Sequence, residues 1–397
     1  MRKLVEINAA ANYGSTGRIA EAIGLAAMRE GWECTMVHGP RYSNPSQLAE
    51  ICTQGKLGDL MHGLRSLLLD GHGLGSERAT RRLVAELDGI KPDVVHLHNV
   101  HGYYLNYRVL FEWLQRADCK VVWTLHDCWP FTGHCTYFDF IGCDRWQTGC
   151  HECPQLGAYP RSLFVDRSER NYELKRRLFT SLGDRLTLVP VSHWLEGLVR
   201  ESFFKGSAIR TIHNGIDTSV FAPRRKERRR DYVLGVASPW TARKGLNDFV
   251  ELRKALPDDA DIVLVGLTVK QIKELPAGIA GIERTQNVDQ LAELYSGATL
   301  FANPTYEDNF PTTNLEAMAC GTPVLTYRTG GSPEALTPET GFVADKGDIK
   351  AIADAFSEVR RRGKDAYAAA CRQRALANYN KDDRYADYVR LYDEVCG

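Results

Sequence analysis

Short apolar runs alternate with helix-length segments along most of the chain. LVEIN at 4–8 is rich in strand-forming residues, and 19–31 then places apolar residues at the three- and four-residue spacing of a buried helix face. Similar runs follow, at 34–39 (CTMVHG), 93–99 (DVVHLHN), 120–127 (KVVWTLHD) and 187–194 (TLVPVSHW). Strands joined by helices can lie parallel, so this alternation predicts a doubly wound parallel sheet.

The alternation begins again after residue 230, which predicts a second parallel sheet. Its strand-like runs are YVLGVAS at 232–238, DIVLVG at 261–266, GATLFANP at 297–304 and PVLTYR at 323–328. A chain of 397 residues is long enough for two domains of roughly 200 residues each. We place the boundary at Pro223, before a basic run, and predict Rossmann-like domains at 1–222 and 223–375, followed by a helical segment at 376–397. Ligands of such sheets bind at the carboxyl ends of the strands.

Charge and composition exclude several classes of function. The 50 basic and 50 acidic residues balance, which argues against a nucleic-acid partner, so any anion must be bound locally. The basic run RRKERRR at 224–230 is interpreted as a solvated linker, with a membrane-surface patch as the alternative. There is no run of roughly 20 apolar residues that could span a bilayer. The eleven cysteines are an odd number that suits a reducing compartment, so we expect a cytoplasmic protein.

Two glycine-containing turns carry groups suited to anions. In NYGSTGRI, Gly14 and Gly17 lie between the first strand and the first helix, where glycine permits close approach of the backbone and helix amides attract an anion. A tight turn alone would require the same glycines. In SPWTARKGL, Arg243 and Lys244 follow the first strand of the second domain and could neutralise a diphosphate. Solvated charges at a helix start are the alternative there.

The stretch TYEDNFPTTNLEAMACG at 305–321 joins a loop to a short helix. Thr312 and Thr313 fall in the first turn of that helix, where backbone N–H groups suit a phosphate oxygen. Asp308 on the loop can accept hydrogen bonds from sugar hydroxyls, and Glu316 on the helix can accept both hydroxyls of a ribose. The alternative for Glu316 is an ordinary helix-surface glutamate.

The segment 129–170 interrupts the alternation and gathers four of the cysteines. Their spacing is C-x7-C-x6-C-x2-C, at Cys135, Cys143, Cys150 and Cys153. Four thiolates could hold a structural zinc ion tetrahedrally and stabilise an insertion that lacks periodicity. Free thiols and a redox or iron site are the alternatives, and His134 or His151 could replace one ligand.

Histidine and tyrosine side chains gather after the strand-like run at 93–99. The stretch HLHNVHGYYLNY supplies His98, Asn99, His101, Tyr103 and Tyr104. Aromatic rings with polar tips suit stacking on pyranose faces, which predicts an acceptor site. The alternative is that part of this group belongs to the core.

These motifs together resemble the retaining GT-B glycosyltransferases of family four, within them the enzymes of capsule, colanic-acid and exopolysaccharide type. The most specific part is DNFPTTNLEAMACGTPVLTYRTGGSPE at 308–334. More modest matches are the glycine loop at 14–17, TLHD at 124–127, VPVSHWL at 189–195, IHNGIDTSVFAP at 212–223 and RKG at 243–245. The resemblance covers nearly the whole chain and implies a GT-B fold, in which two Rossmann-like domains face a central cleft and 376–397 crosses back to the first domain.

The resemblance implies catalytic roles for His126, Lys244 and Asp308. In the family two acidic residues are separated by seven others, and Asp308 and Glu316 have this spacing. Because Glu307 lies next to Asp308, it stays open which of these two acids contacts the sugar. The implied donor-binding residues are Gly14, Gly17, Arg243, Lys244, Glu307, Asp308, Asn309, Phe310, Thr312, Thr313 and Glu316. Pro311 stands where the family usually has a glycine. Pro239 stands where the family usually has an arginine, five residues before Lys244, and Arg243 would supply the missing positive charge.

The implied reaction transfers a sugar from a UDP- or GDP-sugar to a glycan or polyprenyl-linked glycan, in cell-surface polysaccharide biosynthesis. It needs no catalytic metal and no enzyme nucleophile, because Lys244 and helix amides stabilise the departing diphosphate. The enzyme is expected in the cytoplasm, where it could also bind peripherally to the inner face of the membrane. The alternatives are a nucleotide-sugar epimerase of the same fold and a non-enzymatic sugar-nucleotide sensor.

Overall fold

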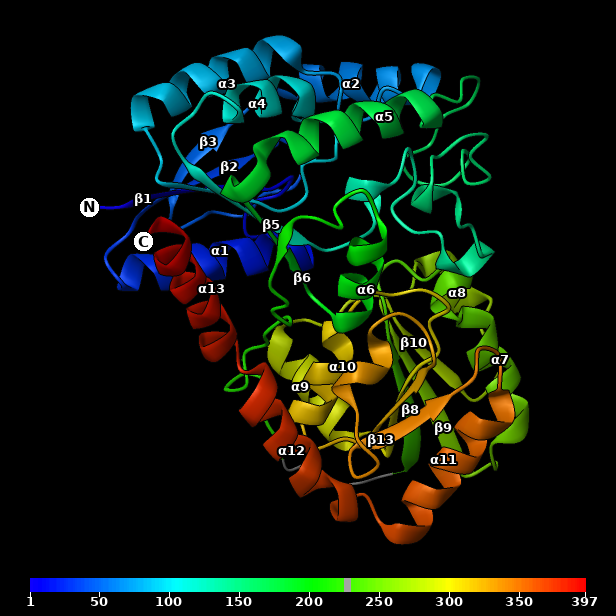
Figure 1. Cartoon of the computed structure of the whole chain (residues 1–397). Helices are drawn as coiled ribbons and strands as arrows, with labels where there is room; N and C mark the ends of the chain where they lie inside the picture. Colours follow the sequence, from blue (N-terminus) through cyan, green and yellow to red (C-terminus); the bar gives the residue numbers. More distant parts are fainter. Residues whose placement is uncertain (225–229) are drawn as a thin grey trace. The chain divides into compact units, whose positions relative to one another are not determined.

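The computed structural model describes residues 1–224 and 230–397 (Figure 1). Residues 225–229 of the basic run lie outside the described part, so neither interpretation of that run is tested. The chain divides into two compact units, of which the first holds 1–213 and 385–397 and the second holds 214–384. The divisions differ from the predicted boundaries at 222/223 and 375/376. The reason is backbone pairing, since Ile216 accepts a hydrogen bond from the Lys381 N–H and donates its own N–H to the Tyr379 carbonyl, both at 2.9 Å.

The first unit is built on a seven-stranded parallel sheet of order β3-β2-β1-β4-β5-β6-β7. Its strands are β1 Lys3–Ile7, β2 Glu33–His38, β3 Ala49–Cys52, β4 Val94–Leu97, β5 Lys120–Leu125, β6 Leu186–Pro190 and β7 Ala208–Ile209. Its helices are α1 Gly14–Arg29, α2 Lys56–Leu69, α3 Glu77–Ile90, α4 Tyr107–Leu114, α5 Ser168–Phe179, α6 His193–Glu201 and most of α13 Lys381–Cys396. The short β3 and β7 were not predicted from the sequence.

Both faces of this first sheet are buried. Successive residues of β1 show it, because Leu4 belongs to one hydrophobic cluster and Val5 to the other. Tyr388 and Tyr392 of α13 join the cluster of Leu4, together with residues of α1. Figure 1 shows α1 and α13 on one side of the sheet and α2 to α5 on the other. The continuous apolar runs of the sequence are therefore explained by strands covered on both faces.

The second unit has a six-stranded parallel sheet of order β10-β9-β8-β11-β12-β13. Its strands are β8 Asp231–Val236, β9 Ala260–Val265, β10 Ile279–Ile282, β11 Leu300–Asn303, β12 Val324–Tyr327 and β13 Gly341–Ala344. Its helices are α7 Leu246–Ala255, α8 Val269–Lys273, α9 Val288–Gly297, α10 Thr312–Ala319, α11 Ile349–Arg362 and α12 Asp365–Tyr379. The two parallel sheets confirm the predicted doubly wound architecture. The strand order reverses between β8 and β11, the position at which ligands of such sheets bind.

The predicted insertion at 129–170 is largely irregular. Its regular structure up to α5 consists of three short 3-10 turns, Trp129–Phe131, Asp139–Ile141 and Arg145–Gln147. Across the whole described part of the chain, no helix combines the length and the apolar character that crossing a membrane requires.

Candidate functional site

Lys244 and Asp308 meet at the strand-order reversal of the second sheet. Lys244 ends the 3-10 turn Ala242–Lys244 after β8, and Asp308 lies in the loop after the neighbouring strand β11. Their side chains form an ion pair and are 22% and 16% exposed. The other carboxylate oxygen of Asp308 accepts a hydrogen bond from the Asn309 N–H at 2.9 Å. The two loops thus bring one cation and one carboxylate together at the carboxyl ends of adjacent strands.

Arg243 holds the backbone of the same loop. Its guanidinium donates to the Glu307 carbonyl, and its own carbonyl accepts from the Tyr306 N–H at 2.8 Å. Gly245 follows with φ +74°, and a Cβ there would lie 2.2 Å from the Pro304 carbonyl oxygen, so only glycine permits this close approach. Of the two adjacent acids, Asp308 is paired with Lys244, whereas Glu307 is only 3% exposed.

Helix α10 begins directly after this loop, with Pro311 at its N-cap and half-buried Thr312 and Thr313 in its first turn. The amide groups of the first turn of a helix lack acceptors within the helix and favour an anion. On the same helix the Glu316 carboxylate accepts a hydrogen bond from the Tyr295 hydroxyl at 2.9 Å. Burial and the adjacent Glu316 raise the pKa of Tyr295 well above its usual value, so it remains a donor. Tyr295, which sequence reasoning missed, fixes the orientation of Glu316.

In the first unit, His126 follows β5 and ends a chain of buried hydrogen bonds. The His98 Nε2 lies 2.7 Å from the Glu6 carboxylate, and the His98 Nδ1 lies 3.1 Å from the His126 Nε2. Burial raises the pKa of the Glu6 carboxyl, but His96 and His98 outweigh it and bring that pKa to about 2. Burial and His96 lower the pKa of His98 to about 4 in spite of Glu6. At neutral pH an ionised Glu6 therefore faces a neutral His98.

These protonation states assign the tautomers. A carboxylate only accepts, so the His98 Nε2 carries the proton and its Nδ1 is an acceptor. The His126 Nε2 must then donate to His98, which leaves the His126 Nδ1 without a proton. Burial and the neighbouring His98 hold the pKa of His126 well below its usual value, so this ring is neutral. The resemblance implied a role for His126, but the chain of hydrogen bonds behind it was not predicted from the sequence.

Among the described residues, Glu6, His96 and His98 form the group in which one possible metal-ligand atom from each residue lies within 4.8 Å of the other two. The side chains of this group are engaged in hydrogen bonds. The His96 Nδ1 lies 2.6 Å from the Tyr392 hydroxyl, and its Nε2 lies 2.8 Å from the Thr124 hydroxyl. The carboxylate of Glu6 and the ring nitrogens of His96 and His98 thus already have hydrogen-bond partners, and all three side chains are completely buried.

The predicted acceptor residues divide into two sets. Tyr104 is 2% exposed, and its hydroxyl donates to the Asn99 carbonyl at 2.9 Å, so it serves the core, as His98 does. His101 instead contacts the Asp127 carboxylate at 2.9 Å. Tyr103 packs edge-on against His72, and His72 packs in the same way against Tyr159. Aromatic rings do gather here, but His72 and Tyr159 come from sequence segments that carried no signal.

Gly14 and Gly17 belong to the first turn of α1 rather than to a separate loop. A Cβ on Gly17 would lie 2.9 Å from the Ala10 carbonyl oxygen, whereas nothing lies within 4 Å of one on Gly14. Packing of α1 against the preceding turn thus accounts for Gly17, and φ +65° accounts for Gly14.

Comparison with known proteins matches both units to glycosyltransferases. Residues 16–220 match the family described as Glycosyltransferase Family 4, and 230–361 match Glycosyl transferases group 1. The chain is 27% identical over 323 residues to the putative colanic acid biosynthesis glycosyl transferase WcaC of Escherichia coli K12, covering 77% of each chain. It is 29% identical to the GDP-mannose-dependent alpha-(1-6)-phosphatidylinositol monomannoside mannosyltransferase of Mycolicibacterium smegmatis, covering 51% of this chain and 60% of that one.

Solved structures show the same architecture. Sucrose-phosphate synthase of Thermosynechococcus elongatus superposes with a TM-score of 0.74 at 18% identity, covering 100% of this chain and 99% of that one. HepE of Anabaena in complex with UDP-glucose superposes with a TM-score of 0.67 at 14% identity, covering 99% of this chain and 100% of that one. The fold is therefore GT-B, as the sequence predicted.

Proposed function

The chain belongs to glycosyltransferase family 4, and from that membership we propose that it transfers a sugar, with retention of the anomeric configuration, from a nucleoside diphosphate sugar to a glycan or lipid-linked glycan. The observation that carries this proposal is the partly exposed Lys244–Asp308 pair beside the first turn of α10. A cation from the turn after β8, beside a carboxylate and helix amides from the segment after β11, suits a diphosphate joined to a sugar.

The donor would be bound by groups of the second unit. Lys244 and the first-turn amides of α10 take the diphosphate, so a phosphate replaces Asp308 as the partner of Lys244. Asp308 is then available to the hydroxyls of the sugar. Glu316, oriented by Tyr295, accepts the two ribose hydroxyls. UDP-glucose in HepE and GDP-mannose in the name of the mycobacterial relative support a UDP- or GDP-sugar.

The chemistry would rest on charge stabilisation rather than on an enzyme nucleophile. Negative charge grows on the leaving diphosphate, where Lys244 and the α10 amides stabilise it more strongly than in the bound donor. Since these groups supply positive charge, a divalent ion is not required for departure. The acceptor hydroxyl attacks from the face that the diphosphate leaves, and the diphosphate takes its proton. Neutral His126 would contact the sugar without adding a competing charge.

The acceptor would be a glycan or a lipid-linked precursor of a cell-surface polysaccharide. The resemblance to the colanic acid enzyme supports this class, and the His72, His101, Tyr103 and Tyr159 cluster offers rings for a pyranose.

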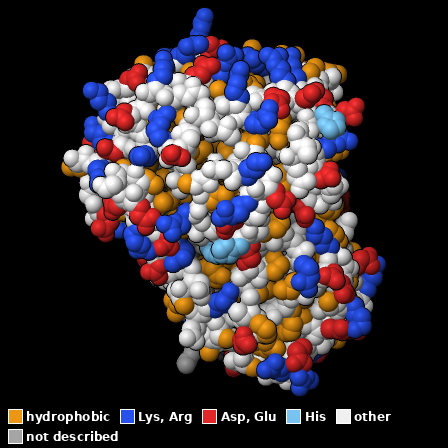
Figure 2. All heavy atoms as spheres, in the orientation of Figure 1, with side chains coloured by type: hydrophobic (Ala, Val, Ile, Leu, Met, Phe, Trp, Pro, Cys, Tyr) orange, Lys and Arg blue, Asp and Glu red, His pale blue; other side chains and the backbone are white. Residues whose placement is uncertain are grey.

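A surface of the first unit also fits peripheral binding to an anionic membrane. Helix α2 exposes one apolar stripe at a spacing of three and four residues, formed by Leu57, Leu60, Met61 and Leu64. A groove of about 630 Å³ beside it is lined by Arg65, Arg78 and Arg82. Figure 2 shows Lys and Arg side chains gathered over the α2 and α3 end of this unit. Apolar side chains flanked by cations suit the surface of an anionic bilayer.

The proposal is tested with a panel of UDP- and GDP-sugars. Thermal shift should identify one donor, and incubation with that donor and candidate acceptors should give a product whose anomeric configuration by NMR equals that of the donor. Inversion of configuration would refute retention. Release of nucleotide with an altered free sugar and no acceptor requirement would favour the epimerase. Activity in EDTA tests metal independence, since immediate loss reversed by magnesium would contradict it.

A further inference from the structure

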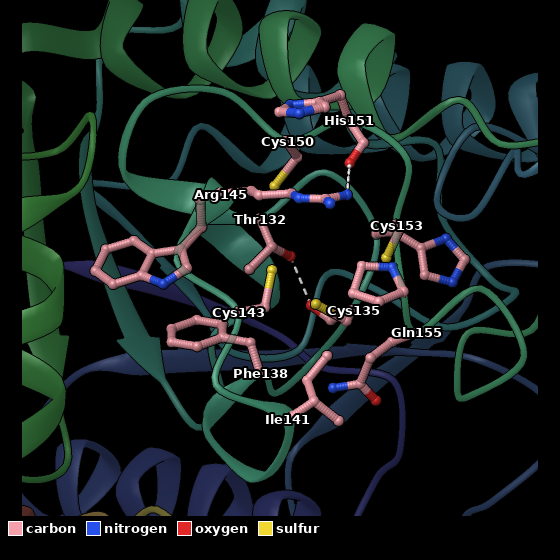
Figure 3. A pocket seen from close by; sticks show the side chains of 13 residues that line it. Thr132, Cys135, Phe138, Ile141, Cys143, Arg145, Cys150, His151, Cys153 and Gln155 are labelled. Atoms are coloured by element: carbon pink, nitrogen blue, oxygen red, sulfur yellow. Dashed lines mark hydrogen bonds between the residues drawn. The ribbon is translucent and has the colours of Figure 1, made fainter.

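The insertion at 129–170 surrounds one small enclosed space with four cysteines. Cys135, Cys143, Cys150 and Cys153 all line this pocket, and all are free thiols. Figure 3 shows their sulfur atoms pointing toward a common space between the loops. The cavity volume is about 10 Å³, which is the room that a single small ion or water needs and far less than a sugar needs.

Other groups of the insertion hold these cysteines in place. The Gly133 N–H donates to the Cys150 sulfur at 3.2 Å, a bond that stabilises a thiolate ligand. The Cys153 N–H donates to the Asp166 carboxylate at 2.6 Å, which fixes the loop that carries it. Arg145 donates to the carbonyls of His151 and Glu152, between Cys150 and Cys153. Hydrogen bonds therefore shape the loop around the sulfurs, although its backbone is irregular.

Two buried polar groups lie near the cysteines. The His134 Nδ1 contacts the Asp70 carboxylate at 2.6 Å, but its Nε2 is buried beside the pocket without a hydrogen-bond partner. The ammonium group of Lys175 is also buried, and it donates to the carbonyls of Trp129 and Thr132. A buried cation is costly unless negative charge lies near it.

We propose that Cys135, Cys143, Cys150 and Cys153 bind one structural zinc ion. Zinc with four thiolates carries a net charge of about −2, which offsets the buried Lys175. Tetrahedral Zn–S bonds of about 2.3 Å place sulfurs about 3.8 Å apart. In the described chain no three of these sulfurs lie within 4.8 Å of one another, so zinc binding requires the sulfurs to move closer together. Binding would close an irregular segment that has few regular backbone hydrogen bonds of its own.

The test is elemental analysis of the purified full chain. We expect about one zinc per chain and, after cobalt substitution, the intense thiolate-to-cobalt absorption of a tetrahedral thiolate site. Cys150→Ser should lower the zinc content at least fivefold. Cys52→Ser, at an exposed cysteine outside the cluster, is the matched control and should keep it. Cobalt spectra of the unmutated chain keep the test valid if Cys150→Ser fails to fold.

Three results would overturn the proposal. Metal-free protein with four titratable thiols in the insertion would remove zinc, and stoichiometric iron would replace zinc by another metal. Zinc retained in Cys143→Ser but lost in His134→Gln would replace the four-cysteine ligand set by three cysteines and His134, with Asp70 orienting the histidine.

A second inference rests on the buried chain in the first unit and on the proposed contact of His126 with the donor sugar. We infer that Glu6 and His98 are positioning residues that fix which nitrogen of His126 carries the proton. The ionised Glu6 sets the direction of both hydrogen bonds, as derived above. The His126 Nδ1 is thereby kept as a hydrogen-bond acceptor, which suits a sugar hydroxyl.

Nitrogen-15 NMR of histidine-labelled protein tests this without relying on activity. The His126 ring should be fully in the Nε2–H form. Glu6→Gln should populate the Nδ1–H form, because an amide can donate as well as accept and lets His98 turn its own tautomer over. Tyr232→Phe removes a hydroxyl of the second unit that donates to the Leu294 carbonyl at 2.6 Å, leaves the chain of Glu6, His98 and His126 intact and should change nothing.

Turnover distinguishes the positioning role from the proposed function. Glu6→Gln should lower kcat about tenfold with KM little changed, and Glu6→Asp, which keeps an acceptor-only group, should recover part of the loss. An unchanged His126 spectrum in Glu6→Gln would overturn the inference. A changed spectrum with unchanged kcat would overturn the positioning role. If His126→Ala keeps full activity, the proposed sugar contact fails instead, whereas the tautomer assignment stands.

Discussion

The two units place different chemistry at the same location of the same kind of sheet. At the strand-order reversal of the second unit, Lys244 and Asp308 form a partly exposed ion pair. At the corresponding end of the first sheet, Glu6, His98 and His126 form a buried chain with both histidines neutral. The carboxyl end of the second sheet, here called the charged edge, thus presents a partly exposed ion pair. The carboxyl end of the first sheet, here called the neutral edge, presents two neutral histidines backed by the buried, ionised Glu6.

The largest expected effect comes from removing the cation of the charged edge. Lys244→Ala should lower kcat about 100- to 1000-fold at saturating donor, because stabilisation of the departing diphosphate is lost. The matched control is Lys254→Ala, an exposed lysine of the neighbouring α7 paired with Glu251. Steady-state kinetics with both variants checks this. Parental turnover in Lys244→Ala would remove the contrast between the two edges.

The neutral edge predicts a pH dependence of stability. The folded-state pKa of His98 is lowered to about 4, so its contribution is present above the unfolded value near 6.5 and is lost as pH falls toward 4. We expect destabilisation of about 3 kcal/mol across that window, an order-of-magnitude figure. Glu6, with a pKa of about 2, adds a loss only below pH 4.5.

Melting curves from pH 7 to 4 check this prediction. His98→Gln removes the titrating ring, so the variant should start less stable and lose less as pH falls. Equal slopes for both proteins would show that His98 is not held neutral.

The sequence predicted the charged edge far better than the neutral one. The loop at 305–311 and the start of α10 are adjacent in sequence, so a local pattern of acids, prolines and threonines indicates the site. The chain of Glu6, His98 and His126 joins three strands, and its contacts arise only from strand order and register. A glutamate in the otherwise apolar LVEIN was the available signal, because a charge in a doubly covered strand requires a buried partner.

The same physical reason explains the unit boundary and the missed aromatic residues. The pairing of Ile216 with 379–381 joins segments that are distant in sequence, which no local pattern reveals. His72 and Tyr159 reach His101 in the same way, through tertiary packing alone. Conversely, Tyr104 has the residue type of an acceptor contact, but packing buries it in the core.

Glu316 sharpens the comparison within the charged edge. Glu316→Ala should weaken donor binding about 100-fold, since two hydrogen bonds to a charged acceptor are worth at least about 1.5 kcal/mol each. Tyr295→Phe should show a smaller loss of the same kind, because Glu316 stays but is less firmly oriented. Calorimetric titration with the nucleoside diphosphate alone measures both. An unchanged Kd in Glu316→Ala would exclude the ribose contact.

The smallest expected effect concerns the outer surface of the first unit. Leu60→Glu places a charge in the exposed apolar stripe of α2 and should weaken binding to vesicles rich in anionic lipid several-fold, through lost burial of one side chain and repulsion by the headgroups. Leu376→Glu on α12 is the matched control, since that leucine is 41% exposed but lies outside the stripe. Co-sedimentation with vesicles at two salt concentrations measures the effect. Equal binding of both variants would separate α2 from the membrane and leave the Lys244 site unaffected, because each surface is tested by its own ligand.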